Sequence, residues 1–149
     1  MNLFELKTKI EQITAEVSEY ARTRALNDIG EEAVEFYSKA FQSNVKGFTD
    51  KSLERWAPLK RPNHARGESN ILVRSGNLSR SIEADVQEKK VIIRAEAFSG
   101  KGFNYAPVHN AGTDRIPQRR FVAHSQALNK LITERLQKKV SDIINKTTR

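Results

Sequence analysis

Residues 81–95 read Ser-Ile-Glu-Ala-Asp-Val-Gln-Glu-Lys-Lys-Val-Ile-Ile-Arg-Ala. Residues 81–86 alternate polar and apolar side chains, as a strand with one buried face does. Glu88-Lys89-Lys90 suits a tight turn, and residues 91–95 return as a second apolar strand. The stretch therefore predicts an antiparallel β-hairpin near the middle of the chain.

The residues before the hairpin have helical spacing. In residues 3–20 the apolar side chains recur at steps of three and four and form one stripe: Leu3, Leu6, Ile10, Ile13, Val17 and Tyr20. A second apolar series follows, at Ile29, Ala33, Phe36 and Ala40. We expect a bend near residue 28, with Asn27 or Asp28 as the cap of the second helix and Gly47 as its stop. A single long helix through residue 28 is the alternative.

A third helix is expected after the hairpin, over residues 122–146. Its apolar face holds Leu128, Leu131, Ile132, Leu136, Val140, Ile143 and Ile144. The order of helices, strands and helix predicts an α+β fold. In this fold the N-terminal helices precede a small antiparallel sheet with a central hairpin, and the C-terminal helix packs on the sheet.

The whole chain, 1–149, is expected to be a single domain. We divide it into a helical part at 1–47, a basic loop at 48–70, a β-rich part at 71–110 and the helix at 122–146. The loop is marked by Pro58, Pro62, Asn63 and Gly67 and carries Lys60, Arg61, His64 and Arg66. Residues 71–73 suit a short strand or a helical turn. Residues 105–109 suit a short strand, with Pro107 favouring an edge.

Composition places the chain among globular proteins. Hydrophobic residues make up 38% and charged residues 30% of the 149, which excludes a disordered or membrane-embedded class. No apolar run is long enough to span a bilayer, and the first residues lack the pattern of a signal peptide. The sequence has no cysteine, so disulfides and thiolate metal sites are excluded.

Charge is spread unevenly along the chain, whose net charge is +8. Residues 1–50 hold 6 Lys/Arg and 9 Asp/Glu, a net charge of −3, and residues 51–149 hold 20 and 9, a net charge of +11. A basic half attracts polyanions or acidic protein surfaces. Ordinary charge variation accounts for the imbalance equally well. The candidates for non-specific contact with nucleic-acid phosphates are Lys60, Arg61, Arg66, Arg119 and Arg120.

The sequence offers little for catalysis. No two of its histidines are one helical turn apart, so a helical metal pair is excluded: His64, His109 and His124. Ser75 and Ser79 lack the context of a nucleophile elbow. We therefore expect no enzyme, with no catalytic, cofactor-binding or metal-binding residue. A nuclease-like enzyme that uses His109 with Asp114 is kept as an alternative.

Four short stretches stand out in the sequence. They are Trp56-Ala57-Pro58-Leu59, residues 71–82, residues 105–112 and residues 116–121. Taken singly, each suits a turn with a core anchor: Trp56 and Phe121 bury rings, and Pro117 stiffens the approach to a helix.

Taken together and in this order, the four stretches resemble the motifs of the phage virion morphogenesis (tail-completion) family. The resemblance covers about residues 36–125. It rests on Trp56, Pro58 and Leu59; on Leu72, Ser75, Gly76, Leu78, Ser81 and Ile82; on Tyr105, Ala106, His109 and Gly112; and on Ile116, Pro117, Arg119 and Phe121. The chain departs from the family pattern at Asn110, where glutamine is common, and at Arg120, where proline is common.

The resemblance implies a structural role in virion assembly. Family members look like tail-completion or neck components at the head–tail junction, which assemble as rings of identical subunits without catalysis or cofactor. The implied partners are further copies of the chain and other phage neck, connector or tail proteins, with non-specific contact to packaged DNA and no membrane. The implied location is the virion, and the cytoplasm of the bacterial host during assembly.

The resemblance also suggests roles for single residues. Trp56 would anchor the helices to the sheet, and Ser75-Gly76 would set the turn into the hairpin. Tyr105 and His109 would fix the bend before Gly112, and Arg119 would pair with a carboxylate within the subunit or across a ring contact. Independently of the resemblance, we infer from the charge distribution that an acidic N-terminal third facing a basic remainder would suit a head-to-tail ring. The alternative function is a small basic nucleic-acid-binding regulator of a prophage.

Overall fold

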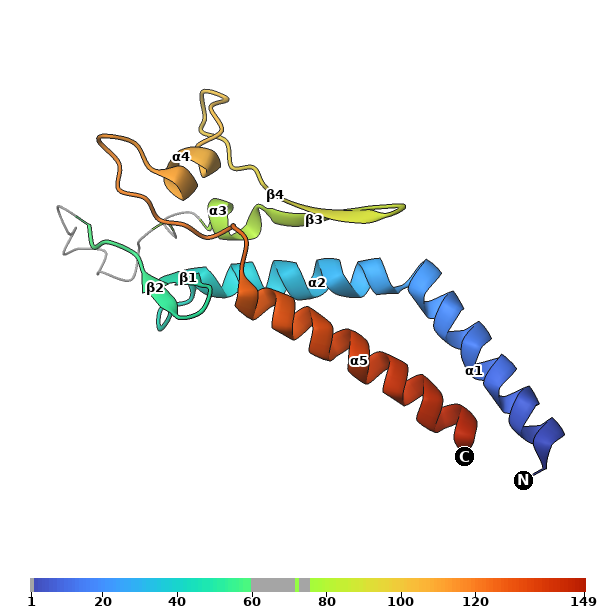
Figure 1. The fold of residues 1–149 in the computed structure, drawn as a ribbon. Helices are drawn as coiled ribbons and strands as arrows, with labels where there is room; N and C mark the ends of the chain where they lie inside the picture. Colours follow the sequence, from blue (N-terminus) through green and yellow to red (C-terminus); the bar gives the residue numbers. More distant parts are fainter. Residues whose placement is uncertain (1, 60–71, 73–75) are drawn as a thin grey trace.

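The computed structural model describes residues 2–59, 72 and 76–149 and has the expected α+β fold (Figure 1). The basic segment 60–70, the short element expected at 71–73 (except Leu72) and Ser75 lie outside the described residues. The elements in chain order are α1 (Leu3–Thr23), α2 (Ala25–Ser38), the 3-10 turn η1 (Lys39–Phe41), β1 (Gly47–Thr49), β2 (Leu53–Arg55), α3 (Asn77–Arg80), β3 (Ile82–Gln87), β4 (Lys90–Ala95), α4 (Ala106–Ala111) and α5 (Gln126–Thr148).

The N-terminal helices meet at Arg24, where φ is −125° and ψ is −28°. The bend was expected near residue 28, and the capping role of Asn27 or Asp28 was wrong. Helical hydrogen bonding resumes directly after Arg24, because the Asp28 N–H donates to the Arg24 carbonyl at 3.0 Å. The Asp28 carboxylate instead accepts a hydrogen bond of 2.6 Å from the Tyr20 hydroxyl, which braces the bend.

Gly47 was expected to stop the second helix, and this was also wrong. The helix ends at Ser38, η1 carries the chain to Phe41, and Gly47 begins β1. Strands β1 and β2 pair antiparallel, with Phe48 opposite Glu54, inside a region expected to be irregular. Strands of three residues are too short to show an alternating pattern, so the sequence did not indicate this hairpin.

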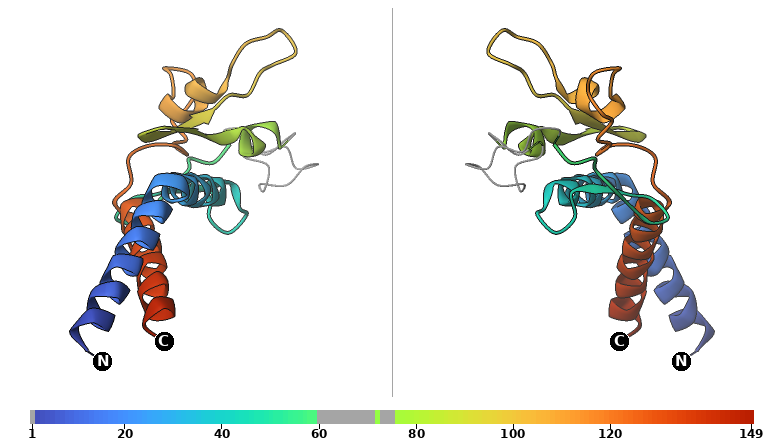
Figure 2. Two further views of the ribbon diagram at one scale, coloured as in Figure 1. Left: turned by 90° about the vertical axis from the view of Figure 1, so that its right-hand side faces the viewer. Right: turned by 90° about the vertical axis from the view of Figure 1, so that its left-hand side faces the viewer.

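The central hairpin is confirmed. Strands β3 and β4 pair antiparallel around a two-residue turn, and Ile82, Ala84 and Val86 lie opposite Ala95, Ile93 and Val91. This apolar face rests on α2 (Figures 1 and 2). The approach is close at Gly30, where an added Cβ atom would lie 3.0 Å from the Cβ of Ala84.

Two expectations for the later part of the chain need correction. Residues 105–109 were expected to form a strand, but they enter α4, because Pro107 suits the first turn of a helix as well as a sheet edge. The C-terminal helix was expected to cover the sheet, but α2 covers it, and α5 packs on α1 and α2. Both views show α2 between α5 and the hairpin, with α4 on the hairpin's far side (Figures 1 and 2).

An ion-pair cluster explains the position of α5. The Arg135 guanidinium lies 3.4 Å from Asp28, 3.0 Å from Glu31 and 3.1 Å from Glu32, all on α2. Further along, the Lys9 ammonium donates to the Thr148 carbonyl at 3.4 Å, so the start of α1 lies beside the end of α5. None of the described helices combines the length and the apolar composition that a membrane-spanning helix needs.

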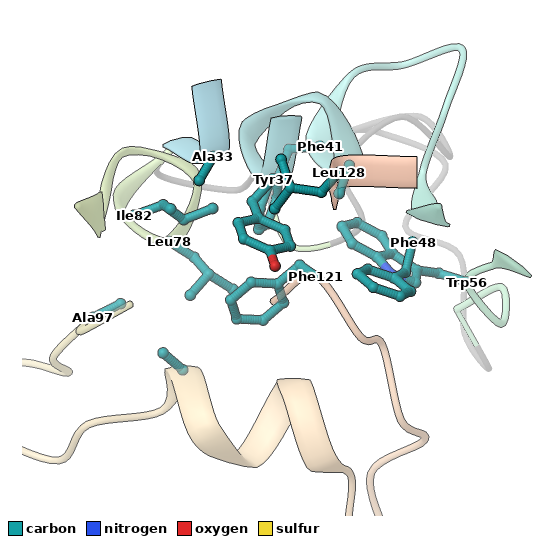
Figure 3. Close-up of a cluster of buried hydrophobic side chains, with 12 residues drawn as sticks. Ala33, Tyr37, Phe41, Phe48, Trp56, Leu78, Ile82, Ala97, Phe121 and Leu128 are labelled. Atoms are coloured by element: carbon teal, nitrogen blue, oxygen red, sulfur yellow. The ribbon is translucent and has the colours of Figure 1, made fainter. Parts of the chain in front are cut away.

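The hydrophobic core lies where α2, the two hairpins, α4 and the segment before α5 meet (Figure 3). Its aromatic centre is continuous: the Phe41 ring lies 5.2 Å from Trp56 and 5.3 Å from Phe121, centroid to centroid. The cluster contains Ala33, Tyr37, Ala40, Phe41, Phe48, Trp56, Leu78, Ile82, Ala97, Ala106, Phe121 and Leu128. Each of the four motif stretches contributes to it.

Candidate structural and interaction site

The first and fourth motifs are joined by side-chain hydrogen bonds to backbone. The Trp56 indole N–H donates to the Arg120 carbonyl at 2.6 Å. In return, Arg119 donates from Nε to the Ala57 carbonyl at 3.2 Å and from its terminal nitrogen to the Pro58 carbonyl at 3.3 Å. The Arg119 side chain is buried, which lowers its pKa by desolvation. These three bonds fix the segment before α5 against the end of β2.

The Arg119 geometry differs from the expected carboxylate pair. Within the described part of the chain, its guanidinium is hydrogen-bonded to backbone carbonyls and forms no ion pair. A residue only 5% exposed is also poorly placed for a contact between subunits. Carbonyl oxygens satisfy a buried guanidinium without requiring a second buried charge.

The third and fourth motifs are joined through Asn110. Its amide oxygen accepts from the Phe121 N–H at 2.9 Å and the Val122 N–H at 3.0 Å, and its amide nitrogen donates to the Val122 carbonyl at 2.9 Å. The Arg119 N–H adds a bond of 2.9 Å to the His109 carbonyl. Asn110 thus holds Phe121 in the core, a role that the sequence did not reveal because this position departs from the family pattern.

Gly112 closes the turn between these two motifs. Its φ is +76°, and an added Cβ would lie 2.7 Å from the Gln118 backbone nitrogen. Both the conformation and the close approach therefore require glycine. The Thr113 N–H then donates to the Ile116 carbonyl at 2.8 Å, so Ile116 and Pro117 return the chain toward Arg119.

The second motif supplies the base of the hairpin. Gly76, at φ +70°, precedes α3, and the Ser81 hydroxyl donates to the Leu78 carbonyl at 2.8 Å. Leu78 and Ile82 are buried in the core, and Leu72 packs against it. Trp56 was expected to join the helices to this sheet. It instead joins Phe41 of η1 to the segment before α5.

Tyr105, which immediately precedes α4, and His109 on α4 lie one turn apart, with their ring centroids 6.0 Å apart. His109 Nδ1 is buried and has no hydrogen-bond partner among the described residues. Burial lowers the pKa of His109, and the nearby charge of Arg119 lowers it further. Asp114 is exposed, and no hydrogen bond or ion pair between it and His109 occurs in this region.

Within the described ranges, no group of three or more His, Asp or Glu side chains could hold a metal ion. Among the described motif residues, Trp56, Leu78, Ile82, Ala106 and Phe121 lie in the core, and the side chains of Trp56, Ser81 and Arg119 donate to backbone carbonyls. Sequence reasoning found the anchors Trp56 and Phe121 but missed two polar contacts besides Asn110. Ser125 caps α5 by accepting from the Leu128 N–H at 3.1 Å and donates to the Thr49 carbonyl at 2.8 Å. Arg135 holds α5 to α2. No pattern of spacing marks either one.

Comparison with known proteins agrees with the motifs. Residues 1–141 match the model of the phage virion morphogenesis family. No curated protein and no solved structure gives a significant match.

Proposed function

This chain belongs to the phage virion morphogenesis family, and we propose that it is a tail-completion or neck protein that acts at the head–tail junction. It would act as a ring of identical subunits in contact with other neck, connector or tail proteins. The role would be structural, without catalysis or cofactor. The observation that carries the proposal is the family match over residues 1–141.

The environment of the motif residues supports a structural role. Trp56, Arg119 and Asn110 join segments that are about 10 to 65 residues apart, through hydrogen bonds to backbone. Side chains that are hydrogen-bonded to backbone in this way stabilise the fold. Catalytic side chains would instead converge on an open cleft. A rigid subunit of this kind suits a protein that connects two preassembled structures.

The exposed charges support contact with polyanions inside a ring. Helix α5 carries Lys130, Lys138, Lys139 and Lys146 on exposed positions. Side chains of this kind bind phosphates without reading sequence. We propose that they meet packaged DNA where it enters the tail.

Deletion of the gene from the phage or prophage that carries it tests the proposal. We expect lysates with DNA-filled heads and complete tails that remain separate in negative-stain images. Purified protein added to such a lysate should yield joined particles and restore infectivity, and buffer alone should not. Joined, infective particles after deletion would overturn the proposal, as would a block before tails are complete.

Filter-binding titrations against salt separate the structural role from the alternative of a prophage regulator. A neck protein should bind DNA weakly, without sequence preference, and lose affinity steeply as salt rises. A regulator would instead prefer one sequence by a factor of about 10³ or more at physiological salt. Such a preference would contradict the structural proposal.

A further inference from the structure

The free end of the helix pair α1–α5 is unusually apolar. Ten large apolar side chains of the described residues are exposed, and five of them lie here: Leu3, Phe4, Leu6, Ile10 and Ile144. Leu3 is 83% and Phe4 78% exposed. We call this surface the arm end. Exposed apolar residues gathered at one place mark a contact surface more often than residues scattered singly do.

The arm end is well ordered as a docking element. Asn2 and Glu5 form a capping box, in which the Glu5 N–H donates to the Asn2 side chain at 2.8 Å and the Asn2 N–H to the Glu5 carboxylate at 3.1 Å. Lys9 reaches the Thr148 carbonyl on α5. A preformed helix loses little entropy on binding. In the inner half of the same apolar stripe, Tyr20 is buried and Ile13 and Val17 are half-buried, so the exposed half continues a partly packed seam.

A groove between α2 and the tip of the central hairpin has matching chemistry. Its floor is apolar and shallow, made by Gly30, Val34, Ala84 and Val86, and its rim carries Asn27, Glu31 and Glu35. Val86 is 40% exposed, although it belongs to the apolar face of the hairpin. The absent side chain of Gly30 leaves the hairpin close to α2 and the floor smooth.

The two surfaces carry opposite charge. Residues 2–10 and 143–149 hold four Lys/Arg and one acidic residue, whereas Ala25–Ser38 holds four acidic residues and no Lys/Arg. Arg135 offsets part of this charge on the side of α2 that faces α5. Glu31 pairs with Arg135 and Glu35 with Lys39, each at 3.0 Å, but the two carboxylates remain 70% and 64% exposed and are accessible at the rim.

We propose that the arm end of one subunit docks in the α2–hairpin groove of a second copy of this chain. Leu3 and Phe4 would cover the floor at Val34 and Val86, and Lys7 would face the rim at Glu35. The contact joins two different patches, so it is head-to-tail and can propagate to a closed ring. It deepens the proposed function, on which it rests, by naming the contact that builds the ring.

This contact is small for a stable dimer. Five side chains are far fewer than the roughly 20–30 residues per side of a standard interface. Pairwise association is therefore weak and gains strength when the ring closes, since the last contacts form within one assembly. A covalent trap detects such a contact better than size measurement at low concentration does.

Cysteine pairing tests the proposal directly, because the chain has no cysteine of its own. Leu3→Cys places a thiol on the arm end, and Glu31→Cys places one on the groove rim, one helical turn from Val34; both positions are exposed. After mixing and mild oxidation, we expect a disulfide-linked dimer from the two variants together, at least tenfold above the yield from either alone. Leu3→Cys mixed with Ser99→Cys, on the far loop, is the matched control and should not cross-link.

Each other outcome overturns the proposal. Cross-linking of Leu3→Cys with itself alone would show a symmetric contact between arm ends. Absence of any cross-link, with circular dichroism showing folded variants, would show that the arm end has another partner. In either case the head–tail role is tested separately by gene deletion, so failure here leaves that role intact.

A charge exchange gives a second measurement. In the cross-linking mixture, Lys7→Glu on the arm variant or Glu35→Lys on the groove variant should each slow the reaction severalfold at low salt. Both changes together should restore it, because opposite charges face each other again. Asp114→Lys, beyond the hairpin, is the control with the same change of charge and should have no effect. Equal slowing by the control would contradict the assigned contact.

Discussion

Asn110 links α4 to the segment before α5 through one side chain, so its removal should lower the stability of the fold. Asn110→Ala leaves the Phe121 and Val122 N–H groups and the Val122 carbonyl without their partner. We expect the free energy of unfolding to fall by about 2 kcal/mol, measured by urea denaturation. Asn145→Ala, at an exposed site on α5, should change it by less than about 0.5 kcal/mol. Equal losses would contradict the role of Asn110.

His109 should make stability depend on pH. Its folded-state pKa is lowered by burial and then by Arg119, so between that pKa and the usual value of about 6.5 the unfolded chain binds more protons. Stability is therefore complete above about pH 6.5 and falls as pH decreases below it. His109→Gln should flatten this part of the curve in thermal melts at pH 5 to 7.5. His124→Gln, an exposed control, should retain the fall because His109 is still present.

Among single residues, the sequence predicted the apolar anchors of the core better than the polar contacts. Trp56 and Phe121 were expected in the core because large aromatic rings seldom find enough contacts elsewhere. The partners of Arg119 are carbonyls 61 and 62 residues away, and every residue has a carbonyl. No residue type could therefore indicate them, and the carboxylate expected within the subunit does not occur beside Arg119 among the described residues.

Among the elements, the contact of α2 with the central hairpin depends on Gly30. Gly30→Val adds a branched side chain where even a Cβ lies 3.0 Å from Ala84 and 3.4 Å from Val86 and Val91. We expect the hairpin to move off α2 and the free energy of unfolding to fall by about 1–3 kcal/mol. Gly100→Val is the matched control, since no atom lies within 4 Å of its added Cβ. A smaller loss for Gly30→Val than for Gly100→Val would contradict a tight contact between α2 and the hairpin at Gly30.

Helix α5 is held to α2 by Arg135. Arg135→Ala leaves Asp28 and Glu32, each less than one-fifth exposed, without their cation. We expect a loss of about 1–2 kcal/mol, below the cost of breaking a fully buried pair because solvent reaches this cluster. Lys130→Ala breaks an exposed pair with Glu134, at 3.9 Å, and should cost less than about 0.5 kcal/mol. Thermal unfolding followed by circular dichroism compares the two.

Elements with a long regular pattern were predicted, and short ones were not. The six-residue strands of the central hairpin repeat polar and apolar positions often enough to set their register. Strands β1 and β2 and helix α4 are three to six residues long, so packing around Phe48 and Ala106 decides their form. The hairpin is covered by α2 and not by α5 because of contacts at Gly30 and Arg135. Neither residue belongs to a sequence pattern that would have indicated these contacts.

For the whole molecule, assembly should respond to the acidic outer face of α1. We expect the triple change of Glu11, Glu16 and Glu19 to lysine to weaken assembly, because these carboxylates would face the basic part of a neighbouring subunit in a contact separate from the arm end and its groove. Light scattering at rising protein concentration measures the effect. Exchange of Glu83, Glu88 and Glu96 for lysine, at exposed positions on and beside the central hairpin, makes the same change in net charge and serves as the control. Rings unchanged by the triple substitution would dismiss charge pairing through this face.

The two ends of the chain lie together, since Lys9 contacts Thr148, and both sit at the arm end. An affinity tag or fluorescent protein fused at either end would therefore crowd the same five apolar side chains. Loop residues 99–102, beyond the hairpin, offer a site for a label on the opposite side of the subunit (Figure 1). This arrangement predicts that a fusion at either end inactivates the protein, whereas a label inserted in the loop leaves it active.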